Sequence, residues 1–104
     1  MKSRLEILEE LVRQDANDSF SRYGLAMEYM KNGDTEKALH TFNDLLQRDP
    51  SYLPVYYQMA KAFEHAGRVS DAADIYRRGL FIAKQQNNLH ALSELQSALD
   101  ELEE

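Results

Sequence analysis

The sequence repeats itself at a fixed interval of 34 residues, and this interval limits the possible folds more than any other feature. The first copy of the pattern consists of Tyr29, Gly33, Ala38, Phe42 and Pro50. Residues of similar type follow 34 positions later, except at the last place: Phe63, Gly67, Ala72, Tyr76 and Lys84. A period of this length is typical of stacked helical repeats, in which each unit buries its apolar face against the next.

Small and large side chains are distributed within each repeat as a packed pair of helices requires. Helix axes that approach closely need small side chains at the contact and large ones beside it. The small set is Ala26, Ala38, Ala60 and Ala72, and the large set is Tyr29, Phe42, Phe63 and Tyr76. Gly33 and Gly67 provide the left-handed backbone that commonly ends a helix. Each repeat is therefore predicted to be a helix–turn–helix unit.

This pattern resembles the tetratricopeptide repeat, whose signature runs W-x2-L-G-x2-Y, then A-x3-F, then P. The first copy supplies Arg22, Leu25, Ala26, Tyr29, Ala38, Phe42 and Pro50, and the second supplies Tyr56, Met59, Ala60, Phe63, Ala72 and Tyr76. Arg22 stands where the family has an aromatic residue, and Lys84 stands where it has proline. The resemblance covers residues 19 to 86 and implies an all-α superhelical stack of antiparallel helices.

Capping signals and apolar periodicity predict six helices, at approximately 3–14, 18–31, 35–48, 52–65, 69–86 and 89–102. Ser3 and Glu6 have the spacing of a capping box, and Asn17 or Asp18 can cap the second helix. Lys84 gives no stop signal, so the fifth helix is extended to residue 86. The 104 residues are expected to form one domain. It comprises an N-terminal half-repeat cap (3–16), two repeats (19–52 and 53–86) and a C-terminal cap helix (88–104).

The last helix carries an apolar seam in place of the repeat pattern. Leu92, Leu95, Leu99 and Leu102 are three, four and three residues apart, which is coiled-coil spacing. Such a stripe is rarely left in water, so it must pack on the preceding repeat or on the same seam of a second chain. A polar outer side suits a cap, and acidic tails would repel each other. We therefore predict a monomer, with a homodimer through these four leucines as the alternative.

The composition argues against several classes of function. There is no cysteine, so disulfides and thiolate metal sites are ruled out. The net charge of −6 argues against a nucleic-acid partner. No apolar run approaches the roughly 18 residues of a membrane span, and the first residues lack the apolar core of a signal peptide. We expect a cytoplasmic protein with no membrane partner.

No group of residues indicates catalysis, a cofactor or a metal site. His40, His65 and His90 are 25 residues apart, and none belongs to a metal-ligand motif such as HExxH. The four glycines are isolated from one another, and no serine has the context of a nucleophile elbow. We therefore expect that the protein is not an enzyme.

The resemblance implies that the first helix of each repeat lines a concave groove. By helical spacing the groove positions are Phe20, Tyr23, Met27, Met30 and Lys31, and one repeat later Pro54, Tyr57, Lys61, Glu64 and His65. Aromatic and methionine side chains supply much of the contact energy in interfaces, and methionine adapts to varied partners. We predict peptide binding by all of these residues except Pro54. The alternative is that some of them pack against the terminal helices as core.

Family members that hold the carboxylate tail of chaperones use Lys, Asn and Arg in the groove. Tyr23, Met27 and Gln58 stand at the corresponding positions here, so a C-terminal carboxylate ligand is not expected. The predicted function is a protein–protein interaction module, a small adaptor or co-chaperone-like protein that binds a peptide or helix. The alternative is a structural repeat protein that self-assembles through its terminal helices. The sequence does not identify the partner.

Overall fold

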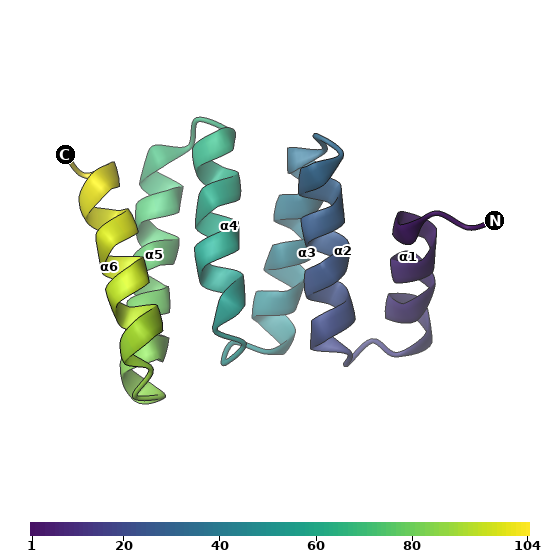
Figure 1. Cartoon of the computed structure of the whole chain (residues 1–104), viewed down its shortest axis with the longest axis horizontal. Coiled ribbons are helices and arrows are strands. Elements are labelled where there is room, and N and C mark those ends of the chain that lie inside the picture. The colour runs from purple at the N-terminus through teal and green to yellow at the C-terminus, as the bar shows by residue number, and fades with distance from the viewer. The chain divides into compact units, whose positions relative to one another are not determined.

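In a computed structural model, which describes all residues from 1 to 104, the chain forms six α-helices and no strand (Figure 1). They are α1 (Arg4–Gln14), α2 (Ser19–Lys31), α3 (Thr35–Arg48), α4 (Pro54–His65), α5 (Val69–Gln85) and α6 (Leu89–Leu102). The predicted all-α class is confirmed, and every helix begins and ends within two residues of its expected bounds. The helices fall into two compact units, residues 1–55 and 56–104.

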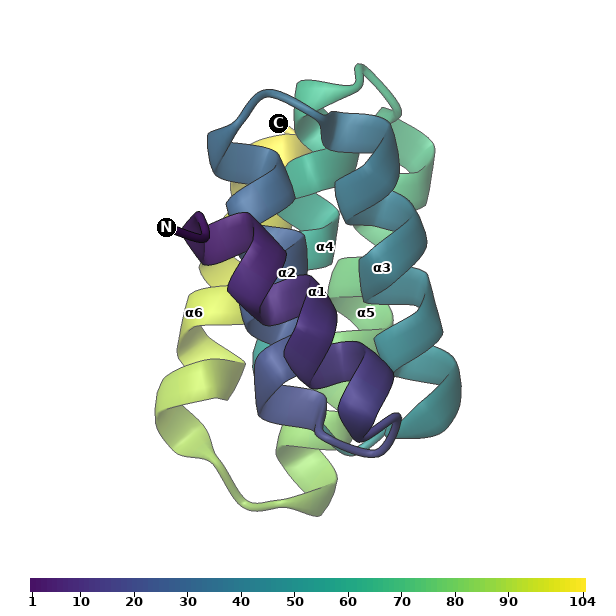
Figure 2. The same cartoon turned by 90° about the vertical axis from the view of Figure 1, so that its right-hand side faces the viewer.

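The first unit is built from α1, α2 and α3. Figure 1 shows α2 and α3 side by side, and Figure 2 shows α1 lying against α2. Ala26, Ala38 and Phe42 are fully buried, as expected for small side chains at a close helix contact and a large one beside it. Leu8 is the buried residue of α1, and its Cδ2 lies 3.2 Å from the position that a Cβ on Gly24 would take.

Polar side chains fix the helix ends of the first unit. The capping box is present, because the Glu6 amide donates to Ser3 Oγ and the Ser3 amide donates to the Glu6 carboxylate. Asp18 caps α2 by accepting from the Ser21 amide at 3.0 Å. The Ser19 hydroxyl donates to Asp49 Oδ2 at 2.7 Å, and this bond ties the start of α2 to the end of α3.

The second unit contains α4 from Tyr56 onward, together with α5 and α6. Figure 1 shows α5 and α6 as an antiparallel pair. Leu95 and Leu99 of the seam are buried, while Leu92 and Leu102 are half-buried. The seam is therefore covered largely within the chain. Arg77 of α5 also forms an ion pair with Glu103, which anchors the end of α6.

Three helices end in the same left-handed turn. Gly33 and Gly67 have φ values of 79° and 74°, and Asn87 has a φ of 55°. In each case the amide of the following residue donates to the carbonyl five residues before it. The distance from nitrogen to oxygen is 2.9 Å for the amides of Asp34 and Arg68, and 3.0 Å for the amide of Asn88. Asn87 thus supplies the stop that Lys84 does not, and α5 ends one residue earlier than expected. None of the six helices is both long enough and apolar enough to cross a membrane.

Candidate functional site

The predicted groove residues of the first repeat all lie on α2, and we call Phe20, Tyr23, Met27, Met30 and Lys31 the α2 face. Phe20 is 77% exposed, and Lys31 is also exposed. The other three side chains are half-buried. The α2 face therefore presents a partly accessible apolar stripe that ends in a lysine, because residues three and four apart share one side of a helix.

Tyr23 is the best-anchored residue of the α2 face. Its ring centroid lies 5.6 Å from that of Tyr52 and 6.3 Å from that of Phe42, both in tilted geometry. Such aromatic pairs restrict the ring and add to the free energy gained by burial. Burial raises the pKa of Tyr52, and the nearby charge of Asp49 adds to the increase. Tyr23 thus presents its accessible surface from a fixed position.

The predicted residues of the second repeat, Tyr57, Lys61, Glu64 and His65, lie on α4, and we call them the α4 face. Lys61 Nζ lies 5.4 Å from the ring centroid of Tyr57 and 3.6 Å from Glu64 Oε2. Lys61, Glu64 and His65 line an open hollow. The α4 face is therefore a connected polar cluster over one aromatic ring, whereas the α2 face is mostly apolar.

The buried Tyr76 of α5 contacts two residues of the α4 face, Glu64 and Tyr57. The sequence did not indicate this role. The Tyr76 hydroxyl donates to Glu64 Oε2, and its ring meets that of Tyr57 in an edge-on contact at 6.1 Å. Burial raises the pKa of Tyr76 above its usual value, and the hydrogen bond to Glu64 raises it further. The sequence marks Tyr76 as a large core residue of the repeat, and nothing in that pattern indicates a polar partner on α4.

The three histidines lie on three different helices, α3, α4 and α6. His40 Nε2 is 3.5 Å from Asp44 Oδ2, and His90 Nε2 is 3.8 Å from Glu94 Oε2, each pair lying along an exposed side of one helix. His65 is exposed at the hollow of the α4 face. The structure has no group of three or more His, Asp or Glu side chains that could hold a metal ion.

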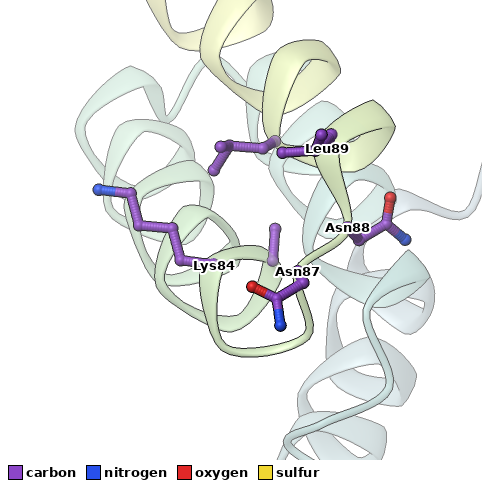
Figure 3. Close-up of a pocket in the computed structure, with 6 residues that line it drawn as sticks. Lys84, Asn87, Asn88 and Leu89 are labelled. Carbon is purple, nitrogen blue, oxygen red and sulfur yellow. The ribbon is translucent and has the colours of Figure 1, made fainter.

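A second small hollow lies where α5 turns into α6 (Figure 3). It is lined by Ala83, Lys84, Asn87, Asn88, Leu89 and Leu92. Asn88 Oδ1 accepts from the Ala91 amide at 3.0 Å and caps α6. Leu89 is 76% exposed. This hollow was not expected from the sequence, because the repeat pattern stops before it.

Comparison with known proteins confirms the predicted repeat family. The family model for the tetratricopeptide repeat matches residues 29–99. A TPR repeat-containing protein of Pseudomonas aeruginosa is 26% identical over 99 residues, covering 95% of this chain and 94% of that protein. The solution structure of a tetratricopeptide repeat domain protein from Salinibacter ruber is 38% identical, with a TM-score of 0.81 over 86% of this chain and 90% of that one.

The fold is also similar to that of the Yersinia enterocolitica type III secretion chaperone SycD, solved in complex with a peptide of the translocator YopD. That structure has a TM-score of 0.86 and 17% identity, and it covers 95% of this chain and 76% of that one. At this identity the likeness describes the fold alone.

Proposed function

Because the chain belongs to the tetratricopeptide repeat family, we propose that it is a protein–protein interaction module that binds a peptide segment of a partner protein. The α2 face and the α4 face are the proposed binding surfaces. The role we assign to the protein is that of a small adaptor or co-chaperone-like protein. The observation that carries this proposal is the exposure of Phe20 beside the half-buried Tyr23, Met27 and Met30 on one side of α2.

The α2 face suits apolar side chains of a partner. Phe20 and Tyr23 offer aromatic area, and the two methionines can adapt their shape to different side chains. Tyr23 is held by Tyr52 and Phe42, so little side-chain entropy is lost when a partner packs on it. Lys31 offers a cation at the end of the stripe. A short segment of apolar residues with one acidic or polar neighbour fits this chemistry.

The α4 face suits polar groups of the partner. The charge of Lys61 is balanced by Glu64, which also accepts from Tyr76. Each carboxylate oxygen has two lone pairs, so Glu64 can still accept from a partner's backbone amide. His65 adds an exposed ring beside the same hollow. We infer that the α4 face selects polar groups of a partner, whereas the α2 face selects apolar ones.

The fold relatives support this use by analogy. The Yersinia chaperone with its translocator peptide, and a domain of yeast Sti1 in complex with Hsp70, show that similarly folded chains bind segments of other proteins. For the present chain, peptide binding is a proposal that rests on its own exposed side chains. The alternative, self-assembly through the α6 seam, has less support because Leu95 and Leu99 are buried within the chain. We propose that the seam closes the second unit.

The test is affinity capture with the purified protein, followed by calorimetry with the captured partner. Phe20→Ala and Lys61→Ala remove one residue from each proposed surface, and Val69→Ala is a matched control because Val69 is 52% exposed outside both faces. We expect Phe20→Ala to weaken binding about tenfold or more, as for a typical aromatic contact, and Val69→Ala to have little effect. A partner that binds the first two variants as tightly as the unaltered protein would refute this assignment.

A further inference from the structure

An exposed stripe with coiled-coil spacing runs along the outer side of α5. The stripe consists of four exposed residues whose successive spacings are four, three and four: Asp74, Arg78, Phe81 and Gln85. Phe81 is 61% exposed, although its ring is among the largest apolar groups of the chain. Residues with this spacing share one side of a helix. This stripe shares no residue with the α2 face, the α4 face or the α6 seam.

The first repeat shows that the fold does not need an aromatic residue at this position. The residues 34 positions earlier are His40, Asp44, Gln47 and Ser51, which are all polar. Gln47 is exposed, as Phe81 is. A change from Gln47 in one repeat to Phe81 in the next places apolar area in water, where it contributes nothing to the stability of the single chain.

The charges around Phe81 are arranged so that the stripe is complementary to itself. Arg78 and Lys84 flank Phe81 at three residues on either side, and neither has a carboxylate partner within the chain. Asp74 lies at the other end of the stripe, 3.4 Å from Arg77 Nη1. The stripe therefore begins with an acidic residue, and Arg78 together with the neighbouring Lys84 makes the part around Phe81 basic. Two such stripes laid antiparallel would bring each acidic end to the basic part of the other.

We propose that the outer side of α5 is a docking surface for the same stripe of a second copy of this chain. The two helices run antiparallel about a two-fold axis, which makes both contributions to the interface identical. Phe81 of one copy then packs under Arg78 of the other, an arrangement in which the guanidinium is attracted to the ring face. Lys84 of each copy faces Asp74 of the other. The exposed Leu89, which lines the same hollow as Lys84, can extend the apolar contact.

This contact belongs to the weak and transient class. One helix side per chain buries less area than a stable interface requires, so the dimer is expected to dissociate on dilution. The net charge of −6 on each chain opposes association at long range. At physiological ionic strength the Debye length is about 8 Å, so this repulsion is screened more than the contacting pairs are. The proposal does not depend on peptide binding by the α2 and α4 faces.

Sedimentation velocity of the full chain over a wide concentration range, at constant physiological salt, tests the proposal. We expect the weight-average mass to rise with concentration from monomer toward dimer. Phe81→Gln, which introduces the residue of the first repeat, should weaken dimerisation at least tenfold. Phe20→Gln is the matched control, because it also removes an exposed phenylalanine and should leave dimerisation unchanged. Circular dichroism of each variant verifies that the helices are retained.

A charge-exchange cycle tests the antiparallel register. Lys84→Glu and Asp74→Lys should each weaken the dimer, and the double variant should restore it toward the level of the unaltered protein. A protein that stays monomeric at every concentration would overturn the proposal. Equal weakening by Phe20→Gln and Phe81→Gln, or failure of the double variant to recover, would also overturn it, since the contact would then lie elsewhere or have another register.

Discussion

Gly79 of α5 lies so close to Tyr56 of α4 that any larger residue would force the two helices to shift. A Cβ on Gly79 would stand 2.7 Å from the Cβ of Tyr56 and 3.2 Å from Cδ1 of Leu95. Tyr56 is 1% exposed, and its Cβ is fixed by the backbone, so it cannot give way by a side-chain rotation. One glycine therefore allows both α4 and α6 to pack on α5.

Replacing this glycine should destabilise the protein. Gly79→Ala would gain up to about 1 kcal/mol in helix propensity, but overpacking typically costs about 1–3 kcal/mol. Because the Cβ of Tyr56 cannot move independently of its backbone, we expect the overpacking cost to win. Urea unfolding followed by circular dichroism would show a lower midpoint.

Gly24 offers a matched control for this prediction. A Cβ on Gly24 would meet only the methyl end of Leu8, at 3.2 Å, and that side chain can rotate. Gly24→Ala should therefore leave stability unchanged or raise it by up to about 1 kcal/mol. If both alanine variants lost the same stability, the close packing of α4 on α5 would not explain the need for Gly79.

Arg22 should contribute to stability although it replaces the aromatic residue of the family pattern. Its side chain is buried, and Nη2 donates to the Ala16 carbonyl at 2.9 Å. Burial lowers the pKa of the guanidinium, which nevertheless stays charged near neutral pH. Arg22→Ala loses both packing and a charged hydrogen bond, so we expect a loss of about 1.5–3 kcal/mol. Thermal unfolding should show it, with the exposed Arg13→Ala unaffected.

The helices could be predicted from the sequence because local signals coincide with the repeat. Ser3 and Glu6 form the expected capping box, and Gly33 and Gly67 adopt the expected left-handed backbone. The positions of Ala26 and Ala38 also predicted the close contact of α2 with α3, because only small side chains allow two helix axes to approach closely. These features depend on residues near in sequence or at one fixed interval, which a single chain displays directly.

Other features depend on contacts that no sequence interval encodes. The bond from Tyr76 to Glu64 joins two helices through side chains that the repeat pattern assigns to a core position and an accessible one. The end of α5 was predicted to within one residue, but its left-handed turn at Asn87 was not, because Asn occupies left-handed backbone less often than Gly. The residues proposed for binding could be placed on one side of α2 and of α4, but their use by a partner stays a prediction.

Asn87 should behave as a residue selected for its backbone conformation. Its φ of 55° is unfavourable for most side chains, and for them left-handed backbone costs about 1–2 kcal/mol. Asn87→Ala should lower stability by about 1 kcal/mol, while Asn87→Gly should match or slightly exceed the unaltered protein. Urea titrations of both variants give the comparison. A fully tolerated alanine would show that the turn between α5 and α6 can adopt another form.

Because of Tyr76, the free energy of unfolding should decrease as the pH rises above 10. Burial raises the pKa of Tyr76 in the folded chain, with the bond to Glu64 as the second cause. Above pH 10 the unfolded chain releases the phenolic proton, while the folded chain keeps it. Unfolding is then favoured as pH rises, with a contribution of at most about 1.4 kcal/mol per pH unit from this group. Below pH 10 the contribution is constant.

The matched pair Tyr76→Phe and Glu64→Gln separates the two causes of this alkaline loss. Tyr76→Phe removes the titrating group, so its free energy of unfolding should fall less steeply between pH 10 and pH 11. Glu64→Gln keeps a hydrogen-bond acceptor and leaves Tyr76 buried, so most of the steep fall should remain because burial is the larger cause. Urea titrations at each pH provide the slopes. If Tyr76→Phe showed the same slope as the unaltered protein, Tyr76 would have to titrate in the folded chain as it does when unfolded.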